Sequence, residues 1–241
     1  GYLFGGVASA RRHALHIANG VYTGGLSGVA FGSEVGMVSR VTQGCQPIGT
    51  VRTVTRAERN LLVTLDGEPA LDCVLRDLGL PKEIGDADLL GALASTLVGI
   101  ELSSEDVPRR PGQFGPETLV RHLLGVGRQQ GLLSVAETVT AGMRLAFCHR
   151  NAMVAQLDLA RIATEIRDEI ERDGMREMAG AVYVSCSGRG GPHFGTPAAE
   201  LAPLRDVIGD VPLVGFFAGG EIAHNRLYGY TGVLTVFTAA R

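Results

Sequence analysis

The chain has 241 residues, of which 22 are basic and 25 acidic, and its formal net charge is −3. This near balance excludes a strong electrostatic field of either sign, so we expect neither nucleic acid nor a membrane surface as a partner. The four cysteines are widely spaced and contain no CxxC pair, which is typical of reduced thiols in a cytoplasmic protein. We find no signal peptide and no apolar run of the ~20 residues that a membrane helix needs. A soluble, cytoplasmic protein is therefore expected.

Short apolar runs divided by glycine fill the first 70 residues and indicate strands and tight turns. The run that ends at Asp66-Gly67 is followed by Pro69, which suits the first turn of a helix. That helix carries apolar residues at helical spacing and should end at Gly79. We place a boundary here, between one half at 1–70 and a second half at 71–241.

The middle of the chain reads as irregular from Gly85 to Arg121, because it contains three prolines. Strands follow, including 135–139 and 143–148, with turns at Gly131 and Gly142.

The clearest helix spans Asp158 to Asp173, where apolar residues recur at helical spacing opposite a charged face, and Gly174 can end it. Strands are predicted at 181–185, 212–216 and 232–238, with a helix at 197–208 between the first two. This alternation predicts an α+β fold of mixed β-sheets covered by helices, in two consecutive halves. Periodicity does not fix the strand order.

Two predicted strands run into glycine-rich segments, Cys186-Ser187-Gly188-Arg189-Gly190 and Gly215 to Glu221. Glycine brings bare backbone N–H groups close to a ligand, and successive N–H groups form an anion-binding concavity. We interpret the two junctions as walls of one ligand cleft. Neither matches the GxGxxG or GxxxxGK[ST] pattern, so a small polar ligand is favoured over a nucleotide.

These motifs, together with Tyr228-Gly229-Tyr230-Thr231 downstream and Gln43 to Gly49 upstream, resemble the FIST proteins. FIST is a sensory module of two consecutive halves that is found in signal-transduction proteins. The first half here begins midway, at Gly5-Gly6, so 1–70 resembles the end of a first half and 71–241 a complete second half. The resemblance implies a non-catalytic sensor of small ligands such as amino acids, whose output is read by a signalling partner.

Arg189 and Glu221 carry the opposite charges of the predicted cleft. The planar fork of an arginine suits a carboxylate, and a glutamate can accept an ammonium group. We therefore expect the two side chains to hold the ends of a zwitterion. Two alternatives remain open. Arg189 can pair with a nearby acidic side chain, and Glu221 can bind the backbone of the Cys186 loop.

Further residues complete the predicted ligand site. Arg150 is expected to approach it from a preceding strand, and Tyr228 can edge it. Phe216 and Phe217 can stack on a ligand or belong to the core. The full set is Cys186, Ser187, Gly188, Arg189, Gly190, Gly219, Gly220, Glu221, Arg150 and Tyr228.

Cys186 also permits a thiol-dependent enzyme, with His193 or His224 as the base and nearby N–H groups as an oxyanion site. A cysteine at such a position is otherwise a small buried hydrophobe. An interaction scaffold without a ligand is a third alternative. No metal or cofactor is expected, because the neighbours Cys148 and His149 point to opposite faces of a strand.

Overall fold

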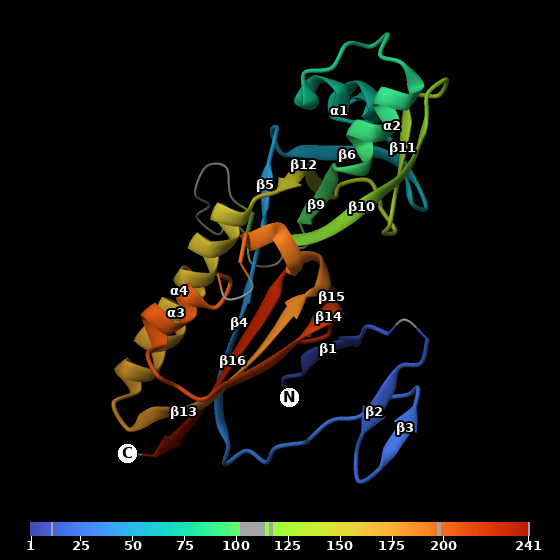
Figure 1. Ribbon diagram of the computed structural model, residues 1–241. Helices are drawn as coiled ribbons and strands as arrows, with labels where there is room; N and C mark the ends of the chain where they lie inside the picture. Colours follow the sequence, from blue (N-terminus) through green and yellow to red (C-terminus); the bar gives the residue numbers. More distant parts are fainter. Residues whose placement is uncertain (11, 102–113, 116–117, 197–198, 241) are drawn as a thin grey trace. The chain divides into compact units, whose positions relative to one another are not determined.

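The computed structural model describes residues 1–10, 12–101, 114–115, 118–196 and 199–240 (Figure 1). The chain forms two compact units that do not follow the order of the sequence. Gly1–Gly44 and Ala152–Arg241 form one, here called the terminal unit, and Cys45–Asn151 forms the other, the central unit. Both contain mixed strand and helix, so the predicted α+β fold in two halves is confirmed.

The terminal unit is built on a six-stranded sheet in the order β1-β14-β13-β16-β4, with β15 paired to β14. The pair β13–β14 is parallel, whereas β1, β15, β16 and β4 join the sheet as antiparallel neighbours. The strands are β1 Phe4–Ala8, β4 Gly36–Thr42, β13 Arg176–Cys186, β14 Leu213–Ala223, β15 Arg226–Tyr228 and β16 Gly232–Ala240. A separate two-stranded hairpin consists of β2 Leu15–Ile17 and β3 Val21–Thr23.

Two helices, α3 Ala152–Asp173 and α4 Ala202–Ile208, pack on this sheet (Figure 1). Residues at helical spacing on α3, such as Leu159 and Ile166, are buried against Tyr183 and Leu234 of the sheet. The predicted helix at 158–173 is confirmed and begins earlier, at Ala152. The predicted helix at 197–208 is shorter in the structure, and its residues 197–198 lie outside the described residues.

The central unit contains the remaining strands and two helices. Its sheet runs β11-β10-β9-β12-β6-β7-β8, and a further pairing of β11 with β7 closes six of the strands into a ring. The strands are β5 Cys45–Pro47, β6 Arg52–Glu58, β7 Leu61–Leu65, β8 Glu68–Pro69, β9 Leu97–Glu101, β10 Thr118–Gly127, β11 Leu132–Val135 and β12 Arg144–Arg150. The helices are α1 Ala70–Leu78 and α2 Asp86–Ala94.

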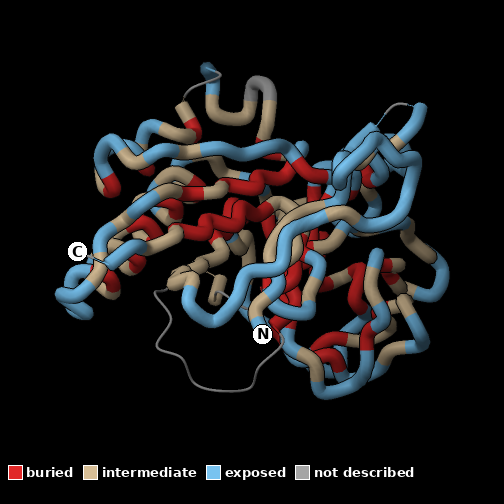
Figure 2. The backbone as a smooth tube through the Cα atoms, turned by 90° about the horizontal axis from the view of Figure 1, so that it is seen from below, coloured by how far each residue is buried: buried red, intermediate tan, exposed pale blue. Residues whose placement is uncertain are grey.

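Helix α1 ends as predicted, because Gly79 adopts φ 66°, a left-handed conformation that suits glycine. Its apolar face is buried against the ring of strands, with Leu71 and Val74 in the core. In both units the buried residues form an inner layer beneath exposed loops (Figure 2).

One prediction about the glycine-rich segments is wrong. The strand predicted at 212–216 does not end at Phe216 but continues through Gly219, Gly220 and Glu221 to Ala223. Glycines allow the strands to approach here, since a Cβ at Gly6 of β1 would lie 2.5 Å from the Cβ of Ala218. The other junction is confirmed: β13 ends at Cys186, and a 3₁₀ turn at Ser187–Arg189 follows.

Candidate functional site

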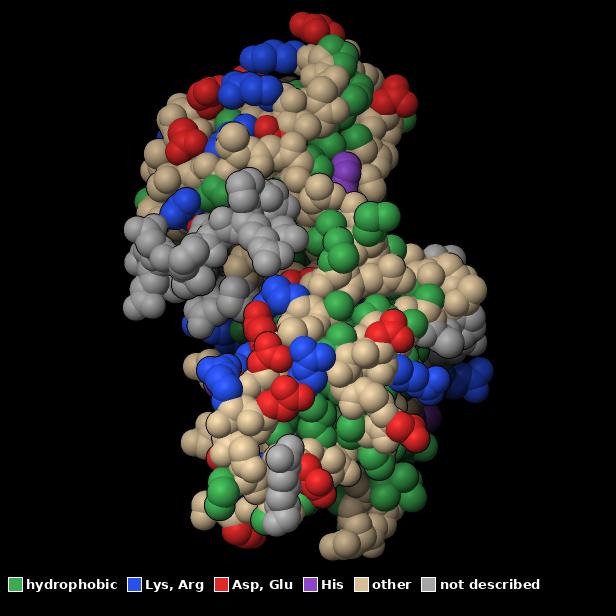
Figure 3. Space-filling view, turned by 90° about the vertical axis from the view of Figure 1, so that its left-hand side faces the viewer, with side chains coloured by type: hydrophobic (Ala, Val, Ile, Leu, Met, Phe, Trp, Pro, Cys, Tyr) green, Lys and Arg blue, Asp and Glu red, His purple; other side chains and the backbone are tan. Residues whose placement is uncertain are grey.

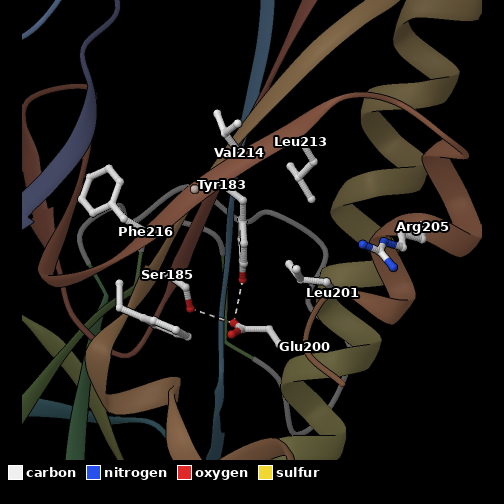
Figure 4. Close-up of a pocket in the computed structure, with 10 residues that line it drawn as sticks. Tyr183, Ser185, Glu200, Leu201, Arg205, Leu213, Val214 and Phe216 are labelled. Carbon is white, nitrogen blue, oxygen red and sulfur yellow. Dashed lines mark hydrogen bonds between the residues drawn. The ribbon is translucent and has the colours of Figure 1, made fainter. Parts of the chain in front are cut away.

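A buried polar cluster lies beside the carboxyl end of β13. Glu200 Oε1 accepts hydrogen bonds from Tyr183 Oη at 2.9 Å, Ser185 Oγ at 2.7 Å and Arg189 Nε at 2.9 Å. Figure 4 shows the bonds from Tyr183 and Ser185 converging on this oxygen. The exposed fractions of Arg189 and Glu200 are 1% and 5%, so water contributes little to their solvation.

The backbone explains why these groups meet. Tyr183 and Ser185 are two residues apart on β13, so their side chains point to the same face of the sheet. That face carries α3 and α4, and Glu200 lies just before α4. The 3₁₀ turn after Cys186 then brings Arg189 back toward the same carboxylate.

A second buried carboxylate, that of Glu221, projects from β14. Its Oε2 accepts hydrogen bonds from the backbone N–H of Thr231 at 3.2 Å and from Thr231 Oγ1 at 2.7 Å. Its side chain has no exposed surface. Burial raises the pKa of Glu221 to about 7, although the hydrogen bonds from Thr231 and the charge of Arg189 oppose this rise.

Three polar atoms of this cluster are left without a partner. Nη1 and Nη2 of Arg189 and Oε1 of Glu221 are buried and make no hydrogen bond among the described residues. The Phe194 ring covers the guanidinium, with 5.3 Å between its centroid and Arg189 Cζ. Each unpaired buried polar group costs about 1–3 kcal/mol, so proteins rarely keep one without a functional reason.

The two charged groups converge on Tyr230 and Thr231. A Cβ added at Gly44 would lie 3.0 Å from the Tyr230 carbonyl oxygen and 3.1 Å from Arg189 Nη1. Thr231, the next residue, holds Glu221. A Cβ at Gly188 would similarly lie 3.0 Å from the Tyr230 ring. Glycine at these two positions therefore lets the backbone close around the charged groups.

The predicted geometry is confirmed in one respect and wrong in another. Arg189 and Glu221 do lie near one another, and the charge of each acts on the other. In the part of the chain that the structure describes, neither residue lines an open cleft, because their exposed fractions are 1% and 0%. Arg189 pairs with an acidic side chain, Glu200, as the alternative interpretation allowed. Glu221 accepts hydrogen bonds from Thr231 and also interacts with the side chain of Cys186.

The structure places the other predicted site residues in three locations. Ser187, Gly188 and Gly190 form the 3₁₀ turn and its end, beside the buried Cys186. Gly219 and Gly220 are strand residues of β14, and Tyr228 of β15 is buried and paired in register with Glu221. Arg150 ends β12 in the central unit. A ligand role for all of these residues remains a prediction.

The environment of Cys186 disfavours a nucleophilic thiolate. Burial and the charge of Glu221 raise the pKa of the Cys186 thiol, whereas catalytic thiols need a lowered pKa. Ring contacts pair His193 with Phe194 and His224 with Tyr2. Among the described residues, no three His, Cys, Asp or Glu side chains are grouped so that they could hold a metal ion.

A pocket of about 240 Å³ adjoins the cluster on the side of Glu200 (Figure 4). Sequence reasoning missed its polar residues, which are Tyr183, Ser185, Glu200 and Arg205. Phe216 and Phe217 line its β14 wall, and they are about half exposed rather than part of the core. The only sequence signal for Glu200 was that no other acidic residue occurs between Ala181 and Arg205.

Comparison with known proteins assigns the family. The FIST N domain model matches residues 1–68, and the FIST C domain model matches residues 70–224. The chain belongs to the FIST family. The resemblance found in the sequence is thereby confirmed, and FIST domains are generally considered sensory domains for small ligands.

Relatives of this FIST protein occur in mycobacteria. An uncharacterized protein of Mycobacterium tuberculosis is 34% identical over 221 residues, which cover 90% of this chain and 55% of that protein. Another, of Mycobacterium bovis, is 34% identical over 247 residues, which cover 97% of this chain and 59% of the relative. The chain thus spans little more than half the length of these curated relatives. No solved structure matches it significantly.

The surface provides two further observations. Acidic and basic side chains intermingle over the face that carries α3 (Figure 3), where Arg161 pairs with Asp158 and Glu165. Within the described residues, no helix has both the length and the apolar character to cross a membrane.

Proposed function

We propose that this FIST chain is a sensory module that binds a small polar ligand between Arg189 and Glu221. The observation that carries the proposal is that, in the described structure, two guanidinium nitrogens and one carboxylate oxygen are buried without a hydrogen-bond partner. A ligand that pairs with them would offset the cost of leaving them unpaired. The general role of FIST domains supports the same conclusion.

The free atoms define the chemistry of the ligand. Nη1 and Nη2 of Arg189 offer a planar pair of donors to a carboxylate, while its Nε is already engaged by Glu200. Oε1 of Glu221 offers an acceptor to an ammonium group. An amino acid carries both groups, and we propose it as the ligand class.

Because Arg189 and Glu221 are both buried, a ligand bound between them would be surrounded by protein. Arg189 is buried and the Phe194 ring lies over its guanidinium, so groups around it must move for a ligand to reach the Nη atoms. Small-molecule sites commonly bury most of the ligand surface, which fits such a closed arrangement.

The test is calorimetric titration of the chain with the amino acids and with matched carboxylic acids and amines that lack one of the two charges. We expect an amino acid to bind more tightly than either fragment, and its affinity to fall as the pH drops below 7 because Glu221 becomes protonated.

Arg189→Lys and Glu221→Gln should each weaken binding at least tenfold, because a charged hydrogen bond contributes about 1.5–3 kcal/mol. The matched control is Arg52→Lys, since Arg52 is also buried but pairs fully with Asp77. The proposal would be contradicted if no amino acid raised the melting temperature of the chain in a thermal-shift screen, or if both site variants kept the unaltered affinity.

A further inference from the structure

One part of the terminal-unit sheet has an open edge. Strand β14 pairs with β13 from Leu213 to Ala218, but on its other side β1 pairs with β14 only from Ala218 to Ala223. Residues 213–217 thus have no strand partner on that side among the described residues. Proteins usually protect such an edge with charge, proline or a covering element.

The open edge is apolar instead. The exposed fractions of Val214, Phe216 and Phe217 are 68%, 49% and 53%. These three large or branched apolar side chains lie within four residues of the sequence, separated only by Gly215. Such a surface is unfavourable to leave in water. This exposure indicates a surface that another chain covers.

Two cavities follow the same edge. The pocket of about 240 Å³ has residues 213–217 as one wall and Leu201 and Arg205 as another (Figure 4). A second cavity of about 590 Å³ continues from Leu213 back to Gly209 and along α4 to Leu204. Arg205 and Leu213 line both, so the cavities form one groove between α4 and the start of β14.

The charges of this groove specify its occupant. Arg205 is exposed, lines both cavities and forms no ion pair among the described residues, whereas Asp210 lines only the second cavity and not the one formed by residues 214–217. Glu200 also lines the first cavity, but its ion pair is with Arg189 and not with Arg205. A partner that places a carboxylate opposite Arg205 therefore complements the groove.

We propose that the groove between α4 and β14 binds an extended peptide segment of a partner protein, which adds as a strand to the edge at 213–217. An acidic side chain of the segment pairs with Arg205, and apolar side chains flanking it pack on Phe216 and Phe217. Strand addition derives affinity from backbone hydrogen bonds and specificity from pockets for alternate side chains. A sensor needs a surface that transmits its state, and this groove contacts Glu200, the carboxylate that holds Arg189.

The test uses three immobilised heptapeptide libraries that carry Glu, Gln or Lys at the central position and random residues elsewhere. The intact chain should be retained at least about fivefold better by the Glu library than by the Lys library. Arg205→Glu should reverse this preference, whereas Arg59→Glu, which changes an exposed arginine of the central unit, should not. Equal retention by all three libraries overturns the proposal.

A second measurement isolates the backbone contribution. Individual peptides selected from the Glu library are resynthesised with N-methyl groups at alternate positions. Methylation of the peptide N–H groups that face β14 should abolish binding, and methylation of the others should not. Equal effects at both sets, or concentration-dependent dimerisation of the chain through Val214 without peptide binding, overturn strand addition by a partner. Neither result bears on amino-acid binding at Arg189, which is measured without peptide.

Discussion

Two buried arginines of this chain have the same kind of partner but use it differently. In the central unit, Arg52 donates from Nη1 to Asp77 Oδ2 at 2.5 Å and from Nη2 to Asp77 Oδ1 at 2.6 Å. In the terminal unit, Arg189 donates to Glu200 through Nε, and neither Nη atom has a hydrogen-bond partner within the described part of the chain. The comparison shows that a buried, ion-paired arginine can have all or only some of its donors engaged. We propose that the unused donors of Arg189 bind a ligand, whereas Arg52 has a structural role.

The largest effect is expected at the fully paired arginine. Arg52→Ala removes both donors to Asp77 and leaves a buried carboxylate without its counter-charge. Loss of one partner of a buried ion pair costs about 3–5 kcal/mol. We expect the free energy of unfolding in urea to fall by this amount. A loss below about 1 kcal/mol would show that Arg52 does not brace the central unit.

Glu221 should make the stability of the chain depend on pH. Its pKa is about 7 in the folded chain and 4.5 as the reference value, so the folded state retains the proton more strongly. The stability that this proton confers is fully present below pH ~4.5 and is lost as the pH rises to about 7, by about 3 kcal/mol in total.

The glutamine variant tests this dependence because it cannot ionise. The free energy of unfolding of Glu221→Gln should rise relative to that of the unaltered chain between pH 4.5 and 7. Above pH 8 the difference between the two proteins should stay constant. The measurement is the free energy of unfolding across this range for both proteins. Parallel pH profiles would mean that Glu221 is not held in its protonated form by burial.

A smaller effect is expected at the partly used arginine. Arg189→Met removes one hydrogen bond to Glu200, but Tyr183 and Ser185 still donate to that carboxylate. It also removes the two Nη groups of the guanidinium, which have no partner among the described residues and whose burial is itself a cost. We expect a loss of about 1–3 kcal/mol in the urea transition of the ligand-free chain. A loss of unfolding free energy as large as that of Arg52→Ala would show that Arg189 has the same structural role as Arg52.

The sequence predicted those parts of the fold that depend on local signals. The helix that ends at Gly79 and the long helix before Gly174 have apolar spacing and a glycine stop within one segment. The junction at Cys186 was recognisable for the same reason. Continuation of β14 through Gly219 and Gly220 was not, because it depends on pairing with β1, more than 200 residues earlier in the chain.

The site was predicted in part. Arg189 and Glu221 were recognised as a pair of charges because both adjoin glycines in the sequence. The partner of Arg189 was missed, since Glu200 lies in a segment rich in alanine and proline without a motif of its own. Enclosure of the pair was also missed, because it arises from Phe194 and Tyr230, which periodicity does not place near an arginine.

The terminal unit consists of two segments separated in the sequence by the central unit, and this affects how it folds during synthesis on the ribosome. Strands β1 and β4 are translated before the central unit, and their partners β14 and β16 follow only after it. At about 5–20 residues per second, β1 waits on the order of ten seconds or more for β14 to be translated. Strands β1 and β4 therefore stay without these partners during that interval, while the central unit can already close around its own core.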